Sequence, residues 1–320
     1  MDQIDEALHW QNRQRFFEAL ASFEPQHKQE TTIEHVRHAL KESRLTLVLG
    51  AGVAADLGLP LWPALMAGLV RRLCVGVPPS LESEVAAVLS DFRSSPLLIA
   101  RHLEMLAGFR SIFMKMLRGC LYENLVEPTN SPLLHSLASC LLLPSAPLPI
   151  RHVITYNFDN LLERYLKALD CNYRSVTSLQ SYATIYGGLK IFHPHGFLPH
   201  PADDPDDRLL EEAVVFSERD YHDEYLNQGS WTSTLQMHHT MTQCCLFVGM
   251  SLSDPDIRRI LDHSSRNQRP ATARHVTIQK IDSSRIRNAF TERELQSLGV
   301  QVLWVNDHEE IPALIKKCCT

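Results

Sequence analysis

The stretch LTLVLGAGVAADLGLP, residues 45–60, decides the fold of this chain. It begins with a short, mostly apolar run, Leu45–Leu49, which predicts a strand. Gly50 and Gly52 follow at once, and because glycine has no side chain, the backbone there can turn tightly and approach a ligand closely. Gly58 comes too late for the G-x-G-x-x-G spacing of the common dinucleotide-binding turn. The stretch therefore predicts a strand that ends in a glycine turn, which either holds a pyrophosphate or serves only as a strand-to-helix connection.

Further strands alternate with helical patterns along the rest of the chain. The strand-like runs are residues 152–155, 190–192, 245–248, 276–279 and 300–305. Apolar residues at helical spacing lie between them and predict covering helices. Alternation of this kind produces a mainly parallel sheet with helices on both faces. We therefore expect an α/β, Rossmann-like fold.

Two other regions have helical patterns. Residues 1–44 contain two candidate helices, 3–20 and 32–42, ahead of the first strand. Between the first and second strands, apolar residues recur at spacings of three, four or seven, so residues 65–143 are expected to form a helical insertion. The predicted organisation is an N-terminal helical segment followed by one ligand-binding domain, residues 45–320, that carries the insertion.

Composition limits the classes of function. The chain has 320 residues, of which 44% are hydrophobic, and this is ample for a buried core. Acidic side chains outnumber basic ones by 37 to 31, which gives a net charge of −6. No run of Lys and Arg resembles a surface that follows a phosphate backbone. Direct binding of nucleic acid is therefore not expected.

Neither a membrane segment nor a metal site is predicted. Residues 1–20 lack the apolar core of a signal peptide, and the most apolar segment, 133–150, is interrupted by three prolines and is shorter than the ~20 residues of a membrane helix. The eight cysteines include no C-x-x-C pair, and Cys140 is expected to be a reduced core residue. His193 and His195 lack a carboxylate or cysteine at a suitable spacing. We expect a cytoplasmic protein without metal.

Three polar segments accompany the predicted strands. TYNFDN, residues 155–160, and VGMSLSDPD, residues 248–256, come at strand ends, and HPHG, residues 193–196, follows a third strand. Each has an ordinary structural explanation on its own; Asn157 and Asp159, for example, suit the start of a helix. Ligands of open parallel sheets bind at the carboxyl ends of the strands. We therefore expect these segments and the glycine turn to converge on one cleft.

In this order the four segments resemble the sirtuin-like superfamily. GAG-x5-G-x-P at residues 50–60 resembles its cofactor loop, and TYNFDN resembles its Thr-x-Asn-x-Asp segment. His195-Gly196 resembles its His-Gly pair, and residues 249–252 resemble its Gly-x-Ser-x segment. The similarity extends from about residue 45 to the carboxyl terminus. It implies that the ligand is NAD.

Two departures separate the chain from the protein deacylases of that superfamily. The two cysteine pairs of their zinc ribbon are missing, and Leu61-Trp62-Pro63 stands where they place an acid, a Phe and an Arg. The pattern GLP-x-W, together with residues 214–226 and 251–261, instead resembles bacterial sirtuin-like proteins of antiphage defence, which are NAD glycohydrolases. The resemblance implies an enzyme that cleaves NAD to ADP-ribose and nicotinamide and depletes NAD as a defence effector.

The resemblance also implies roles for individual residues. Asn157 would position the attacking water or the ribose, and His195 would contact the ribose hydroxyls and assist proton transfer. The other expected NAD contacts are Gly50, Ala51 and Gly52 at the pyrophosphate, Pro60 in the same loop, Asp159 at the nicotinamide amide, and Gly249, Ser251 and Asn306 along the adenosine half. Ala54 stands where the family commonly has Ser, so a hydrogen bond from that side chain to phosphate is not expected.

Two other functions are compatible with the sequence. An NAD-dependent protein deacylase or ADP-ribosyltransferase would need a groove for its acceptor, whereas a sensor module would bind NAD or ADP-ribose and gate a partner without releasing nicotinamide. For a hydrolase, the resemblance implies restraint until an oligomer, a partner or a small-molecule signal releases it. We expect a homo-oligomer, a separate partner that senses infection, or both, docking on the helical insertion or the N-terminal helices.

Overall fold

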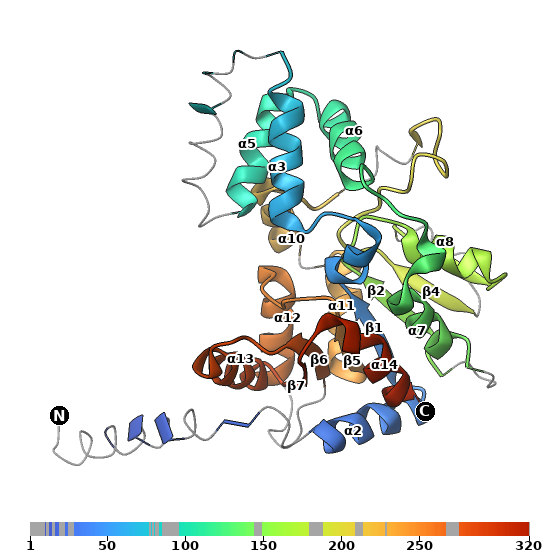
Figure 1. Cartoon of the computed structure of the whole chain (residues 1–320), viewed down its shortest axis with the longest axis vertical. Helices are drawn as coiled ribbons and strands as arrows, with labels where there is room; N and C mark the ends of the chain where they lie inside the picture. The colour runs from blue at the N-terminus through green and yellow to red at the C-terminus, as the bar shows by residue number, and fades with distance from the viewer. Residues whose placement is uncertain are drawn as a thin grey trace.

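A seven-stranded sheet forms the centre of the molecule (Figure 1). The structure is a computed structural model, and it describes residues 10, 13–14, 17–18, 23–24, 29–76, 78, 80, 83–84, 96–143, 149–178, 188–208, 214–227, 229–266 and 275–319. The helix expected at residues 3–20 lies largely outside this part of the chain.

Every strand pair of the sheet is parallel, which confirms the predicted α/β, Rossmann-like fold. The strands are β1 (Leu45–Leu49), β2 (His152–Thr155), β3 (Tyr173–Val176), β4 (Leu189–Phe192), β5 (Cys244–Val248), β6 (His275–Lys280) and β7 (Val300–Val305). Their order across the sheet is β3-β4-β2-β1-β5-β6-β7. All residues of β1 and β5 are buried, as expected for central strands covered on both faces.

The strand order reverses at β1. From β1 the chain goes to β2 on one side and later returns to β5 on the other side of β1. Leu49 pairs with both Thr155 and Val248, so the carboxyl ends of these three strands are level. A reversal of this kind leaves a crevice at the carboxyl ends of the strands, where ligands of open α/β sheets bind.

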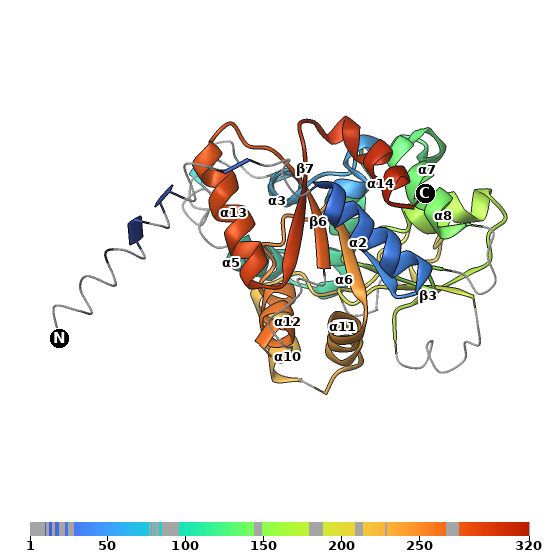
Figure 2. The same ribbon diagram turned by 90° about the horizontal axis from the view of Figure 1, so that it is seen from below.

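Helices cover both faces of the sheet (Figure 2). Leu47 and Leu49 point to one core, and Val48 points to the other, because side chains alternate along a strand. The helices that cover the first face are α2 (Gln29–Lys41), α7 (Pro132–Leu141), α8 (Leu161–Ala168) and α14 (Ile311–Cys319). The helices that cover the second face are α11 (Trp231–Thr242), α12 (Pro255–Arg266) and α13 (Arg285–Ser297).

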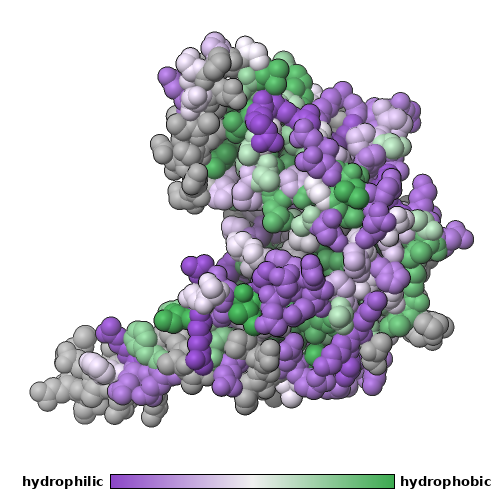
Figure 3. Space-filling model, in the orientation of Figure 1, coloured by the Kyte–Doolittle hydropathy of each residue, from purple (hydrophilic) through white to green (hydrophobic). Residues whose placement is uncertain are grey.

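A helical lobe stands over the carboxyl ends of the strands (Figure 1). It consists of α3 (Trp62–Leu73), α5 (Pro96–Ala107) and α6 (Arg110–Leu121), which pack on one another, and α10 (Glu218–Leu226), which packs on α5. Figure 3 shows a hollow between this lobe and the part of the surface formed by α12 and α13. The described residues between β1 and β2 form helices and turns and contain no strand. The lobe therefore lies over the carboxyl ends of the strands, where a ligand is expected.

Several details differ from the sequence-based expectations. The expected helix at residues 32–42 begins earlier, as α2, and β3 was not predicted. Cys140, expected to be reduced, instead forms a disulfide with Cys319, which joins α7 to α14 across a sequence separation of 179 residues. None of the helices in the described part of the chain combines the length and apolarity that crossing a membrane requires.

Candidate active site

The turns that follow β1 and β5 lie in backbone contact. The Gly50 N–H donates to the Val248 carbonyl at 3.0 Å, and the Gly52 N–H donates to the Gly249 carbonyl at 2.9 Å. A Cβ atom on Gly52 would lie only 2.9 Å from Gly249 Cα, closer than real Cβ atoms approach other atoms. The glycines therefore allow the two turns to meet at the point where the strand order reverses.

The glycine turn is also closed upon itself. The N–H groups of Val53 and Ala54 donate to the carbonyls of Gly50 and Ala51 in the short 3-10 helix Ala51–Val53. Together with the bonds to Val248 and Gly249, these contacts occupy the N–H groups of four residues of the turn. Ala51 is exposed at its tip, and Pro60, at the end of the same loop, is half-buried. The expected contact with a pyrophosphate stays a prediction, and it has to use the exposed face of this turn.

Asn157 lies just beyond the end of β2. Its backbone N–H donates to Thr155 Oγ1 at 3.2 Å, and its carbonyl oxygen lies 3.4 Å from Nδ1 of His193. Its side-chain oxygen, Oδ1, is buried and has no hydrogen-bond partner among the described residues. Buried polar atoms in proteins are almost always hydrogen-bonded, and an exception calls for an explanation such as a missing ligand.

Trp62 provides a second atom of this kind. Its indole Nε1 is buried without a partner in the described part of the molecule. The Trp62 ring packs 4.8 Å from the ring of Phe216, which in turn lies 6.0 Å from the ring of Phe158, the neighbour of Asn157. An unpartnered donor and an unpartnered acceptor are thus linked by one aromatic cluster between the helical lobe and β2. In the sequence, Trp62 is part of the GLP-x-W pattern and of the departure from the deacylases, but it was not predicted as a site residue.

His195 is buried between two tyrosine rings. The ring of Tyr156 lies 4.7 Å from the imidazole and the ring of Tyr221 lies 5.6 Å from it, both in edge-to-face geometry. Tyr221 comes from α10 of the helical lobe, and its hydroxyl donates to Asp254 Oδ2. His195 therefore lies where the sheet and the lobe meet. Neither tyrosine was predicted as a site residue, although Tyr156 lies within the TYNFDN segment.

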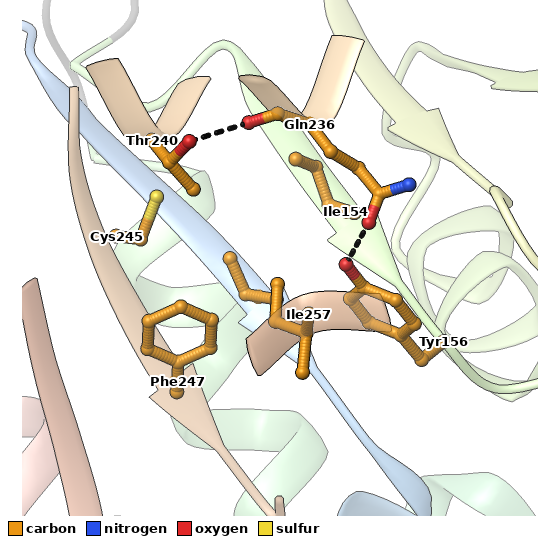
Figure 4. Close-up of a pocket in the computed structure, with 8 residues that line it drawn as sticks. Ile154, Tyr156, Gln236, Thr240, Cys245, Phe247 and Ile257 are labelled. Carbon is orange, nitrogen blue, oxygen red and sulfur yellow. Dashed lines mark hydrogen bonds between the residues drawn. The ribbon is translucent and has the colours of Figure 1, made fainter. Parts of the chain in front are cut away.

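A small cavity lies behind Tyr156, between the sheet and α11 (Figure 4). The Tyr156 hydroxyl donates to Gln236 Oε1, and Thr240 Oγ1 donates to the Gln236 carbonyl at 3.0 Å. The other residues that line the cavity are Val48, Ile154, Cys245, Phe247 and Ile257. These belong to the core on the second face of the sheet, so the cavity is a gap in the packing behind His195 and not the cleft for a dinucleotide.

Asp159 combines a structural contact with an unusual environment. It is buried, and one carboxylate oxygen accepts the Leu161 N–H at 3.0 Å at the start of α8, as expected for a residue at a helix start. Burial raises the pKa of Asp159 to about 6; the nearby Glu163 carboxylate adds to the increase, and His193 opposes it. The contact with the nicotinamide amide stays a prediction.

Replacing Asp159 with Asn is expected to stabilise the protein at neutral pH. Because the folded-state pKa of about 6 exceeds the ordinary value of 3.8, the folded protein binds more protons than the unfolded chain between these values. Stability therefore falls as the pH rises from 3.8 towards 6 and stays lower above it. Asn keeps an oxygen for the Leu161 N–H and cannot ionise. Urea unfolding should show a gain of about 3 kcal/mol at pH 7.5 and almost none at pH 4; equal gains at both values would contradict the assignment.

The segment after β5 is organised by its own side chains. Ser251 is exposed, and its hydroxyl lies 2.7 Å from that of Ser253. Asp254 Oδ1 accepts the N–H groups of Asp256 at 2.9 Å and Ile257 at 3.2 Å, which caps the start of α12. The Met250 carbonyl accepts a hydrogen bond from Gln279 of β6 at 2.8 Å. Ser251 is thus presented at the surface beside the β1 turn.

Asn306 is placed differently from the other predicted residues. It follows the edge strand β7, two strands away from β5, and is exposed. Its backbone N–H and its side-chain amide both donate to the Glu310 carboxylate, at 3.0 and 3.2 Å. The structure thus brings the segments after β1, β2, β4 and β5 together at the carboxyl ends of the strands. Asn306 lies at the carboxyl end of the edge strand β7, farther from these segments.

In the described part of the chain, no group of three His, Cys, Asp or Glu residues is arranged to hold a metal ion.

Comparison with known proteins relates the chain to a domain family and to a characterised hydrolase. The sequence model of the SIR2-like domain matches residues 151–303, a range that includes Asn157, His195 and Gly249. The chain is also 23% identical over 310 residues to the NAD(+) hydrolase ThsA of Enterococcus faecium. That alignment covers 89% of this chain and 57% of the relative, so the chain spans a little more than half of that protein's length.

Proposed function

We propose that the chain, which matches the sequence model of the SIR2-like domain over residues 151–303, is an enzyme that hydrolyses NAD to ADP-ribose and nicotinamide. The observation that carries this proposal is the buried, unpartnered Oδ1 of Asn157, held at the same edge of the sheet as His195 and the glycine turn. The distant similarity to an NAD(+) hydrolase supports the same reaction.

The dinucleotide would lie across the reversal of strand order. The pyrophosphate would meet the turn at Gly50, Ala51 and Gly52, and the adenosine half would extend along Gly249 and Ser251 towards β7 and Asn306. The nicotinamide half would then point to the ends of β2 and β4. The support for this orientation is that ligands of open α/β sheets bind at such a reversal, and that the turns after β1 and β5 meet there.

The reaction requires positioning more than a strong nucleophile. Breaking the bond between nicotinamide and ribose creates an oxocarbenium-like centre, to which one water adds while nicotinamide leaves and one proton is released. Asn157 would orient the water or the ribose through Oδ1. His195 would contact the ribose hydroxyls and accept the proton from the water, a role that imidazole performs well near neutral pH. Asp159 would contact the nicotinamide amide.

The biological role is proposed from the resemblance of the sequence to antiphage proteins. Depletion of NAD in infected cells would make the chain a cytoplasmic defence effector. Such an activity needs restraint, and we propose that an oligomer of this chain or a separate partner that senses infection supplies it. Of the two alternatives, an NAD-dependent deacylase or ADP-ribosyltransferase would release nicotinamide only when an acceptor is present, and a nucleotide sensor would release none.

Product analysis separates these functions. Purified protein, alone and in lysate of phage-infected cells, is incubated with NAD, and nicotinamide and ADP-ribose are quantified by chromatography, with His195→Ala as the control. Equal amounts of both products from the wild type alone would support hydrolysis. Nicotinamide release that depends on an acetylated peptide or another acceptor would favour the transferase alternatives. NAD binding without nicotinamide release in any condition would favour the sensor and would overturn the proposal.

A further inference from the structure

A buried pair of ionisable side chains lies directly beneath Asn157. His193 is 1% exposed and Glu163 is 4% exposed, and the His193 Nε2 atom lies 2.7 Å from Glu163 Oε1. His193 follows β4, and Glu163 lies on α8. A buried hydrogen bond of this kind gains little net stability, because on folding it replaces the hydrogen bonds that both groups make with water. Stability alone therefore does not explain this pair.

The imidazole of His193 is held in one orientation. Ser175 of β3 donates to Glu163 Oε1 at 3.0 Å, which fixes the carboxylate from the other side. The backbone N–H of His193 donates to the Val176 carbonyl at 3.0 Å, and the His193 ring packs 4.6 Å from the ring of Phe197. Both the backbone and the ring of His193 are thus anchored, and its second ring nitrogen has a defined direction.

That second nitrogen faces Asn157. The His193 Nδ1 atom lies 3.4 Å from the Asn157 carbonyl oxygen, while the Asn157 N–H donates to Thr155 Oγ1 at 3.2 Å. Side chains therefore contact the backbone of Asn157 on both sides. The side-chain oxygen has no partner among the described residues. The position of this oxygen is accordingly set through the backbone.

We infer that Glu163 and His193 form a positioning pair, which places the side chain of Asn157 for the reaction by holding its backbone carbonyl. This inference rests on the proposed NAD hydrolysis. Glu163 orients the imidazole, and the imidazole fixes the turn between β2 and α8. Neither residue has to touch the substrate. A misplacement of about 1 Å in a reacting group can lower a rate about 10²-fold, so loss of the pair should be visible in turnover.

Kinetics of three variants test the inference. Glu163→Ala is expected to lower kcat about 10²-fold and to change KM by less than about 3-fold, because the turn loses its support while the nucleotide contacts remain. Glu163→Gln is expected to recover most of the lost rate, since its amide nitrogen can donate to Nε2 of a neutral His193 and leave the Nδ1 proton for the Asn157 carbonyl. The matched control is His239→Gln, which removes another buried histidine, bonded to Thr46 at 3.0 Å near the opposite end of the strands. It should lower the melting temperature without lowering kcat.

Amide hydrogen exchange provides a readout that does not depend on turnover. In the peptide that covers residues 155–160, exchange should accelerate about 10-fold in Glu163→Ala and stay near the wild-type rate in Glu163→Gln and His239→Gln. Unchanged exchange and unchanged kcat in Glu163→Ala would overturn the positioning pair. If the wild type released no nicotinamide, NAD hydrolysis would fail by itself, and the exchange rates would still decide whether the pair holds the Asn157 turn.

Discussion

Replacing Asn157 with alanine is expected to lower nicotinamide release from NAD about 10²- to 10³-fold while the protein stays folded. The large kinetic effect follows from removing a polar group that acts on the reacting centre, and losses of this size are typical of such groups. The stability effect should stay within about 0.5 kcal/mol, because Oδ1 forms no hydrogen bond with any described residue. Initial rates and chemical unfolding of the same preparation measure the two effects separately.

The neighbouring Asn160 provides a matched contrast within the same motif. Its Oδ1 accepts the His200 N–H at 2.9 Å, and its Nδ2 donates to Asp203 at 2.9 Å, so its side chain is fully engaged in the protein. Asn160→Ala is therefore expected to lower the unfolding free energy by about 1 to 3 kcal/mol. Asn157→Ala with a wild-type rate, or with the stability loss expected of Asn160→Ala, would contradict the role proposed for Asn157.

The central strands were predictable because their sequences are mostly apolar. Residues 45–49 and 245–248 are central strands buried on both faces, and such strands need no polar positions. β3 was missed for the opposite reason. It is an edge strand whose sequence, YRSV, has a single fully buried residue, so its apolar content is too small to identify it. The disulfide between Cys140 and Cys319 was also missed, because sequence spacing carries no information about pairs this far apart.

The candidate site was predictable as motifs but not as contacts. The order of the four segments led to Asn157 and His195, and the sheet explains why segments so distant in sequence reach one edge. Glu163 left no signal, and Tyr221 was noticed only as part of residues 214–226, because each lies in a helix where a polar or aromatic residue has many ordinary uses. The sequence also did not predict what Gly50 and Gly52 contact. Their spacing predicts a close approach to a ligand, whereas in the structure they allow the turns after β1 and β5 to contact each other.

The contact between these turns should be very sensitive to Gly249. Its φ is +68°, in the left-handed region that favours glycine, and a Cβ added there would lie 2.6 Å from the Val53 nitrogen. Gly249→Ala therefore combines a backbone cost of about 1 to 2 kcal/mol with an overpacking cost of about 1 to 3 kcal/mol. We expect the unfolding free energy to fall by about 2 to 5 kcal/mol, and NAD binding to be lost with the turn.

Gly188→Ala separates the two costs. Gly188 precedes β4 with a φ of +75°, and a Cβ there would have no neighbour within 4 Å among the described residues. It should therefore show only the backbone cost, about 1 to 2 kcal/mol, and unchanged NAD binding. Urea unfolding and calorimetric titration with NAD measure both variants. Equal losses of stability would mean that the turns after β1 and β5 can separate without cost. In that case their contact would not shape the crevice, and the proposed path of the dinucleotide across it would lose its main support.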